Sequence, residues 1–322
     1  MPMINRIAEF QQEMAGWRQD IHAHPELGFE ETRTADFVAQ KLEEFGIKVH
    51  RGVGKTGIVG VLTVGNETNS VGLRADMDAL PIKENNTFSH CSTNGGAMHA
   101  CGHDGHTVML LAAAKYLVES KDFRGQVNFI FQPAEEGLGG AQAMLADGLL
   151  EQFPCDSLYA IHNAPGLPLA KFAAAPGIRT AAGAFFDIRI AGKGAHGAFP
   201  DQGVDPVVIA GELILALQSV VSRNISPTQT AVLSITQVHA GDAYNVIPGT
   251  AHLAGTVRTF SMQVMGHIEQ RVDDLVKGIC AAHGATGNLD FRTIFHPVVN
   301  EPAVTDLAAG VCDELVGAGN VT

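Results

Sequence analysis

The hydrophobic pattern of this chain changes near residue 180, and this change constrains the fold more than any other feature. Before that point, short apolar runs alternate with helical segments, as in QVNFIFQP at 126–133 and SLYAIHNAP at 157–165. Strands that alternate with helices are typical of an α/β domain with a parallel sheet between its helices. We therefore expect a mostly parallel sheet, flanked by helices, within residues 1–180.

After residue 180 the apolar and polar residues alternate, which is the pattern of a half-buried strand; AGAFFDIRIAGKG is the first example. The predicted order is β-α-β-β-α-β, with helices near 206–222 and 262–283. This order suits an antiparallel sheet with helices on one face, as in ferredoxin-like α+β units. We interpret residues 181–294 as a second domain inserted into the first, and residues 295–322 as the return to the first domain.

Composition excludes several classes of protein. The 322 residues are 46% hydrophobic and 17% charged, which is ordinary for a soluble enzyme with two domains. The net charge is −13 without a Lys/Arg cluster, so we expect no nucleic-acid partner. The N-terminus lacks the apolar core of a signal peptide, and apolar runs such as VMLLAAA are too short to span a bilayer. With five scattered cysteines, these features predict a cytoplasmic protein without a membrane partner.

Polar residues that could bind a ligand or take part in catalysis gather where predicted strands end or a helix begins. The five segments are HAHPELGFEE (22–31), GLRADMDALPI (72–82), MHACGHDGH (98–106), FIFQPAEEGLGGA (129–141) and AIHNAPGLP (160–168). Four of them sit at the carboxyl end of a predicted strand or at the start of a helix. In open α/β sheets this edge binds ligands, so we place the candidate site there.

The segment CGHDGH carries the residue types of a metal site. Cys101 and His103 flank Gly102, which lets the backbone turn so that both side chains can point at one place, and we expect a helix to follow from about Thr107 to Glu119. A thiolate and an imidazole are good ligands for zinc or a similar divalent ion, and the positive end of a helix dipole favours the thiolate. A competing interpretation is a thiol enzyme in which Cys101 is the nucleophile and a histidine is its base. A chelator would spare that enzyme.

Glu135 and Glu136 are adjacent, so they cannot share a face of an extended backbone. One can bind metal while the other projects toward substrate and acts as a general base. His162, after another predicted strand, supplies a further nitrogen ligand. Three aspartates could orient the imidazoles from behind, namely Asp76, Asp78 and Asp104.

Six ordered motifs together resemble one known family. They are RQDIHAHPELGFEE, GLRADMDALPI, MHACGHDGHT, FQPAEEGLGGA, HNAPGLP and GKGAHGAFPDQGVDPV. The chain resembles, from about residue 7 to residue 302, the metal-dependent amidohydrolases that include bacterial hippurate hydrolases, N-acyl-amino-acid amidohydrolases and plant auxin-conjugate hydrolases. These are relatives of aminoacylase and of the carboxypeptidase G type of zinc peptidase. The resemblance implies a catalytic α/β domain with two divalent metal ions and an inserted lid or dimerisation domain.

The resemblance implies roles for individual residues of the first domain. The implied metal ligands are Cys101, His103, Glu136 and His162. Glu135 is the implied general base, which takes a proton from the water that attacks the amide carbonyl and passes it to the leaving amine. The metal ions would polarise the carbonyl, and zinc or manganese suits the ligand set best, with cobalt or nickel also suitable. The implied reaction is hydrolysis of N-acyl or N-aroyl amino acids to a carboxylic acid and a free amino acid.

The resemblance also implies residues of the lid domain and a homodimer formed through it. His196 is expected to reach a substrate oxyanion, often across the dimer interface, although it could be a simple loop histidine. Asn245 and Arg258 match positions that contact a substrate carboxylate, which arginine can bind with two hydrogen bonds. The alternative for Arg258 is a salt bridge on the strand face. We interpret His22 and His24 as structural supports.

One feature departs from the family pattern. The family has a further metal-ligating histidine near its C-terminus, in closing strands of the catalytic domain, whereas this sequence ends at Thr322 without a later histidine of that kind. The alternative expectation is therefore a truncated, catalytically impaired relative that folds or dimerises without a complete dinuclear site. Its catalytic domain would be incomplete at the C-terminal part.

Overall fold

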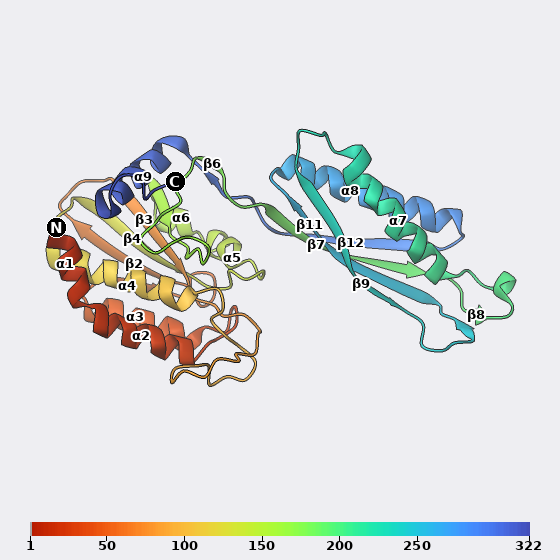
Figure 1. Ribbon diagram of the computed structural model, residues 1–322, viewed down its shortest axis with the longest axis horizontal. Helices are drawn as coiled ribbons and strands as arrows, with labels where there is room; N and C mark the ends of the chain where they lie inside the picture. The colour runs from red at the N-terminus through yellow and green to blue at the C-terminus, as the bar shows by residue number, and fades with distance from the viewer. Residues whose placement is uncertain (1) are drawn as a thin grey trace. The chain divides into compact units, whose positions relative to one another are not determined.

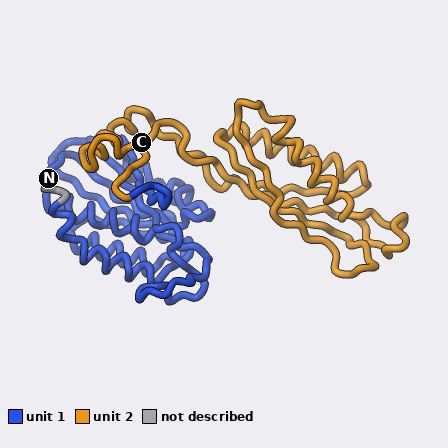
Figure 2. The backbone as a smooth tube through the Cα atoms, viewed as in Figure 1, with its two compact units in different colours: residues 1–168 blue, residues 169–322 orange. Residues whose placement is uncertain are grey.

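The computed structural model describes residues 2–322, which form two compact units divided between Pro168 and Leu169 (Figure 2). All of the segments that carry the expected metal ligands belong to the first unit. The expected inserted domain, 181–294, lies within the second unit. Its boundaries, and the assignment of 295–322 to the catalytic part, stay predictions.

The first unit contains a five-stranded sheet of mixed direction (Figure 1). Its strands are β1 (Lys48–Arg51), β2 (Ile58–Val64), β3 (Ser70–Asp76), β4 (Gly125–Gln132) and β5 (Ser157–Ala160), in the order β1-β2-β4-β3-β5. β3 is parallel to β4 and β5, but β2 is antiparallel to β1 and β4. The sheet is therefore mixed: β1, β3, β4 and β5 share one direction, as expected of a mostly parallel sheet, and β2 runs against them. The short β1–β2 connection, with Gly52 and Gly54 at positive φ, returns the chain antiparallel to itself.

Helices cover this sheet and enclose its core. They are α1 (Pro2–Glu9), α2 (Gln11–Ala23), α3 (Thr32–Glu44), α4 (His103–Ser120), α5 (Gly140–Ala146) and α6 (Leu149–Gln152). Phe129 and Phe131 of β4 pack with residues of α2, α3 and α4, such as Leu111. Ile130 joins a smaller cluster with Met144 of α5. Successive residues of β4 thus enter two different clusters, as expected of a strand buried on both faces.

The second unit contains a four-stranded antiparallel sheet with α7 (Pro206–Asn224) and α8 (Met262–Ala282) packed against it. The strands are β7 (Ala182–Ala191), β9 (Ala231–Ala240), β11 (Thr250–Thr259) and β12 (Thr286–Phe295), in the order β12-β7-β11-β9. This β-α-β-β-α-β order agrees with the ferredoxin-like pattern expected from the sequence. The remaining elements are β6 (Gly177–Ile178), β8 (Ala195–His196), η1 (Pro200–Gln202), β10 (Val246–Ile247), β13 (Val299–Asn300) and α9 (Pro302–Val316).

Helix α7 is, among the described residues, the one helix long and apolar enough to cross a membrane by length and composition. Single polar residues such as Glu212 interrupt its hydrophobic stretches, so no long apolar run marks this helix in the sequence. Ile209, Leu213, Leu217 and Val220 of α7 are buried in the core of the second unit. This inward stripe is typical of a core helix of a globular domain. The expected cytoplasmic location stays a prediction.

Candidate metal centre

A turn at the start of α4 brings two of the expected ligands together. Gly102 has φ +94°, and a Cβ placed there would lie 2.5 Å from Oδ1 of Asn163. Cys101 precedes this glycine and His103 begins the helix. Ligand atoms of Cys101, His103 and Glu136 all lie within 4.8 Å of one another. The turn predicted from Gly102 therefore does place the thiol and the imidazole at one point.

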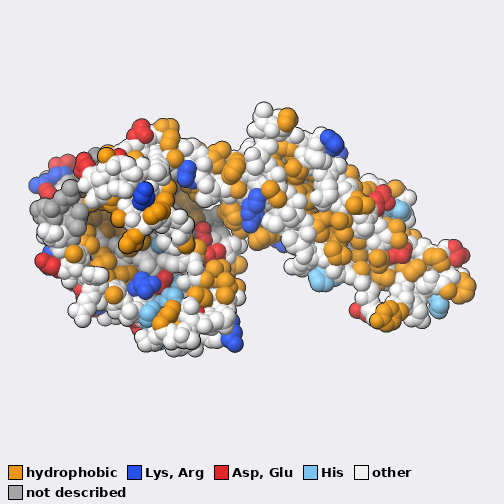
Figure 3. Space-filling model, in the orientation of Figure 1, with side chains coloured by type: hydrophobic (Ala, Val, Ile, Leu, Met, Phe, Trp, Pro, Cys, Tyr) orange, Lys and Arg blue, Asp and Glu red, His pale blue; other side chains and the backbone are white. Residues whose placement is uncertain are grey.

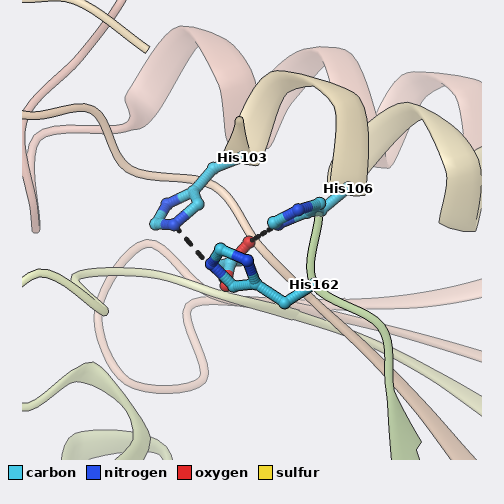
Figure 4. A group of neighbouring side chains, drawn as sticks. His103, His106 and His162 are labelled. Carbon is cyan, nitrogen blue, oxygen red and sulfur yellow. Dashed lines mark hydrogen bonds and ion pairs between the residues drawn. The ribbon is translucent and has the colours of Figure 1, made fainter. Parts of the chain in front are cut away.

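His162, on the segment after β5, completes the group of expected ligands. Its Nε2 lies 3.4 Å from Sγ of Cys101, and it belongs to a second group of ligand atoms within 4.8 Å, which also contains His103. Figure 4 shows His103 and His106 projecting from α4 toward His162. The structure thus brings together all four side chains that the resemblance implies as ligands.

The hydrogen bonds of the imidazoles leave suitable nitrogen atoms for a metal ion. Nδ1–H of His103 donates to the carbonyl oxygen of Asp78 (2.8 Å), so its Nε2 carries the lone pair. This buried Nε2 makes no hydrogen bond to any residue that the structure describes, and it lies 3.7 Å from Asp76 and 4.0 Å from Glu136. Nδ1–H of His162 likewise donates to the Asn163 carbonyl (2.8 Å), which leaves Nε2 facing Cys101. A buried nitrogen lone pair among carboxylates and a thiol fits a divalent metal ion.

Two buried aspartates strengthen the negative character of this site. Burial opposes the ionisation of Asp76, but the hydrogen bond from His106 and the charge of Arg74 outweigh it and hold its pKa well below the usual range. Burial likewise opposes ionisation of Asp78, and hydrogen bonds from His103 and from the backbone of Glu136 lower its pKa overall. Both carboxylates stay ionised, so the site favours a cation.

The thiol of Cys101 responds in the opposite way. Burial, followed by the negative charge of Glu136 and Glu135, raises its pKa to about 12. The effect expected of the helix dipole is therefore outweighed by burial and by the carboxylates. A thiolate at this position needs a cation beside it. This argues against Cys101 as a free nucleophile.

The two adjacent glutamates follow β4 and differ in their surroundings. Glu136 is half-buried and belongs to the ligand cluster, whereas Glu135 is exposed. Partial desolvation and the charge of Glu136 raise the pKa of Glu135. The expected division of roles, in which one glutamate holds metal and the other faces substrate, stays a prediction.

The sequence analysis did not single out His106 or Asn163. Nδ1 of His106 lies 2.7 Å from Oδ1 of Asp76, and the Asn163 backbone N–H donates to Nε2 of His106 (3.0 Å). His106 thereby ties α4 to the segment of His162. Its position three residues after His103, on one face of the helix, is the signal that would have identified it, but the helix was expected to begin near Thr107.

The third aspartate orients a different histidine. Asp104 lies 2.9 Å from Nδ1 of His22, whose Nε2 lies 3.2 Å from Glu84. His24 contacts the carbonyl oxygen of Asp20 through Nδ1 (2.7 Å). These contacts agree with structural roles for both histidines.

The expected substrate contacts of the second unit fall in two places. His196 of β8 pairs with Val246 of β10, and Gly197 N–H donates to the carbonyl oxygen of Asn245 (2.7 Å), so His196 and Asn245 are exposed neighbours at this pair of short strands. Arg258 lies near the other end of β11, where it donates to Oγ1 of Thr256 (2.6 Å). Within this unit the structure therefore does not gather all three residues.

Comparison with known proteins identifies the family. The family described as Peptidase family M20/M25/M40 matches residues 72–322 of this chain. A hippurate hydrolase from Campylobacter jejuni is 44% identical over 320 residues, covering 99% of this chain and 83% of the relative. An N-acyl-L-amino acid amidohydrolase from Geobacillus stearothermophilus is 42% identical over 297 residues, covering 91% and 80%. The crystal structure of a dinuclear metal-binding peptidase of the M20 family from Bacillus subtilis matches with a TM-score of 0.80 and 33% identity, covering 96% of this chain and 81% of that one.

The fold, the ligand cluster and these relatives define a metal-dependent amidohydrolase. The chain belongs to peptidase family M20/M25/M40.

Proposed function

We propose that this chain hydrolyses the amide bond of N-acyl or N-aroyl amino acids and releases a carboxylic acid and a free amino acid. The observation that carries the proposal is the convergence of Cys101, His103, Glu136 and His162, with the exposed carboxylate of Glu135 beside them. The relatives named hippurate hydrolase and N-acyl-L-amino acid amidohydrolase support this class of substrate.

The same four side chains would hold two divalent metal ions per chain. Thiol and imidazole donors favour zinc, while the nearby carboxylates also suit manganese, cobalt or nickel. When bound, the ions would polarise the substrate carbonyl and lower the pKa of water. The lone pair on Nε2 of His103 and the cation-favouring charge of Asp76 and Asp78 support this assignment.

Glu135 is the proposed general base. Its carboxylate takes a proton from the water that adds to the amide carbon, and it then gives that proton to the amine nitrogen as the C–N bond breaks. Its raised pKa supports the base role, because a carboxylate with a raised pKa accepts a proton more readily and is better able to carry it to the amine. Its exposure gives a substrate access to it.

His196 is the proposed donor to the substrate oxyanion, and Asn245 and Arg258 are the proposed contacts of the substrate carboxylate. The Ala198 N–H donates to Nδ1 of His196 (3.1 Å), so the proton of a neutral ring lies on Nε2. An exposed ring with Nε2–H available supports a donor role.

We also propose a homodimer that forms through the second unit. Hydrophobic side chains line the visible surface of this unit (Figure 3). Val208 and Leu215 of α7 are 59% and 75% exposed, although the opposite stripe of the helix is buried. An apolar outer face of this kind supports an interface with another copy.

The proposal is tested by metal content per chain, measured beside hydrolysis of hippurate and a small panel of N-acyl amino acids with and without chelator. About two metal ions per chain, with chelator-sensitive release of free amino acid, is the expected result. Weak binding of a single ion without turnover would favour the impaired relative instead. Turnover that a chelator leaves unchanged would favour the thiol enzyme.

A further inference from the structure

The segment GFEE at 28–31 contains a buried carboxylate that the proposed mechanism does not use. Glu31 has no exposed surface in the first unit. Its Oε1 accepts a hydrogen bond from the backbone N–H of Ala134 (2.7 Å), and its Oε2 accepts one from Oγ1 of Thr56 (2.6 Å). A buried carboxylate is costly unless its oxygens are satisfied, so this position is strongly specified by its two donors.

The residue that Glu31 holds lies in a strained part of the loop after β4. Ala134 has φ +49°, in the left-handed region that residues other than glycine rarely adopt. It directly precedes Glu135 and Glu136. Two residues on, the N–H of Glu136 donates to Oδ2 of Asp78 (2.9 Å). Two buried carboxylates thus hold the backbone on both sides of Glu135.

Close packing restricts movement of this loop. A Cβ at Gly28 would lie 3.0 Å from Cα of Ala134. A Cβ at Gly57, next to Thr56, would lie 3.1 Å from Cδ of Pro133. The segments that supply Glu31 and Thr56 therefore press against the loop at the residues that precede the two glutamates.

We propose that Glu31 is a positioning residue for Glu135 and Glu136. By accepting the Ala134 N–H, it holds the left-handed turn that directs Glu136 into the ligand cluster while Glu135 faces outward. The proposal rests on the roles given above to these two glutamates. It deepens that function by assigning a task to a residue 103 positions earlier in the chain.

Two variants of Glu31 separate positioning from general stability. Glu31→Gln keeps an oxygen for the Ala134 N–H, and its amide NH2 can donate to the Thr56 hydroxyl. Glu31→Met has a similar length but cannot accept either bond. The matched control is Glu26→Met, because Glu26 accepts the N–H groups of Arg33 (2.9 Å) and Thr34 (2.8 Å) at the start of α3. Glu26→Met removes a side-chain carboxylate that accepts backbone N–H groups, and it leaves the contacts of the loop after β4 unchanged.

The first measurement is titration of each purified protein with Co²⁺, followed by absorption, because the bands of bound Co²⁺ report the number and geometry of its ligands. The second is kcat and KM for hippurate. We expect Glu31→Met to change the cobalt spectrum and to lower kcat about 10- to 100-fold with little change in KM, as is usual when a group behind a metal ligand is lost. Glu31→Gln should keep most of the wild-type cobalt spectrum and kcat, and Glu26→Met should leave the cobalt spectrum unchanged.

A wild-type spectrum and kcat in folded Glu31→Met would overturn the proposal, and so would equal changes in Glu31→Met and Glu26→Met. The spectrum also separates this proposal from the proposed function. If the wild-type protein binds Co²⁺ but does not release amino acid from hippurate or from the substrate panel, the proposed function fails. The comparison of cobalt spectra would then still decide the role of Glu31.

Discussion

Replacing Gly102 with alanine adds one methyl group at the turn between Cys101 and His103. Backbone strain of an L-residue at φ +94° lowers the free energy of unfolding by about 1–2 kcal/mol. The new Cβ would also lie 2.5 Å from Oδ1 of Asn163. Displacing Asn163 weakens its contact with His106 and costs about 1 kcal/mol more. Alanine stiffens the unfolded chain, which returns roughly 0.4–1 kcal/mol. We therefore expect the first unit to lose about 2 kcal/mol of unfolding free energy.

The chain offers a direct assay for this prediction. Its single tryptophan, Trp17, is buried in the core of the first unit, so tryptophan fluorescence during denaturant unfolding reports that unit. Metal content of the same samples reports the site, and Gly102→Ala should reduce it because His162 and Cys101 are displaced together.

Gly105→Ala is the matched control in the same helix. A Cβ there would have Arg18 Cδ as its nearest neighbour, at 3.9 Å. Gly105 lies in the first turn of α4, so this change should stabilise the unit by at most the helix-interior value of about 0.5–1 kcal/mol. A Gly102→Ala protein that unfolds at the wild-type midpoint and keeps its metal would refute the reasoning.

Three further outcomes follow from the site and from the charges of the second unit. Glu135→Gln should lower kcat for hippurate about 10²- to 10⁴-fold with unchanged metal content, and loss of metal would show that this residue is a ligand instead. Chelation should abolish turnover and lower the unfolding midpoint read by Trp17, with both restored by added metal; an unchanged midpoint would contradict metal binding to the native state. In the second unit, hydrogen bonds from Arg292 and then His252 lower the pKa of Asp187, so its ionised form adds stability above about pH 4, and this is lost as the pH falls through the lower native pKa. Asp187→Asn should therefore destabilise the unit by no more than about 1 kcal/mol at pH 7 and by nothing at low pH, as followed by circular dichroism; a difference that persists in acid would exclude this ion pair as the cause.

Local pattern was sufficient to predict which candidate ligand side chains the fold brings together. Cys101, His103, Glu136 and His162 each follow a strand or begin a helix, and these positions meet at one edge of an α/β sheet. The turn at Gly102 could be inferred because only the two residues beside it needed to be considered. The order of elements in the second unit could also be predicted, since its strands alternate between polar and apolar residues.

Features that depend on distant residues could not be predicted in this way. The antiparallel direction of β2 follows from its pairing with β4, a partner some sixty residues later, and apolar content does not report strand direction. The hydrogen bond from Ala134 N–H to Glu31 spans 103 positions, and the sequence alone does not distinguish a buried glutamate from a solvated one. His106 was missed because the start of α4 was placed four residues too late.

The central position of β4 has a consequence for the timescale on which the site can open. Each edge of this strand pairs with a neighbour, β2 on one side and β3 on the other, and all of its residues except Gln126 are buried. Amide hydrogens in such a strand exchange with solvent only when the whole unit unfolds. Glu135 lies three residues after the end of this strand, so the backbone that precedes it belongs to the slowest-exchanging part of the first unit. Loss of activity on heating should therefore coincide with global unfolding of that unit rather than with an earlier local opening.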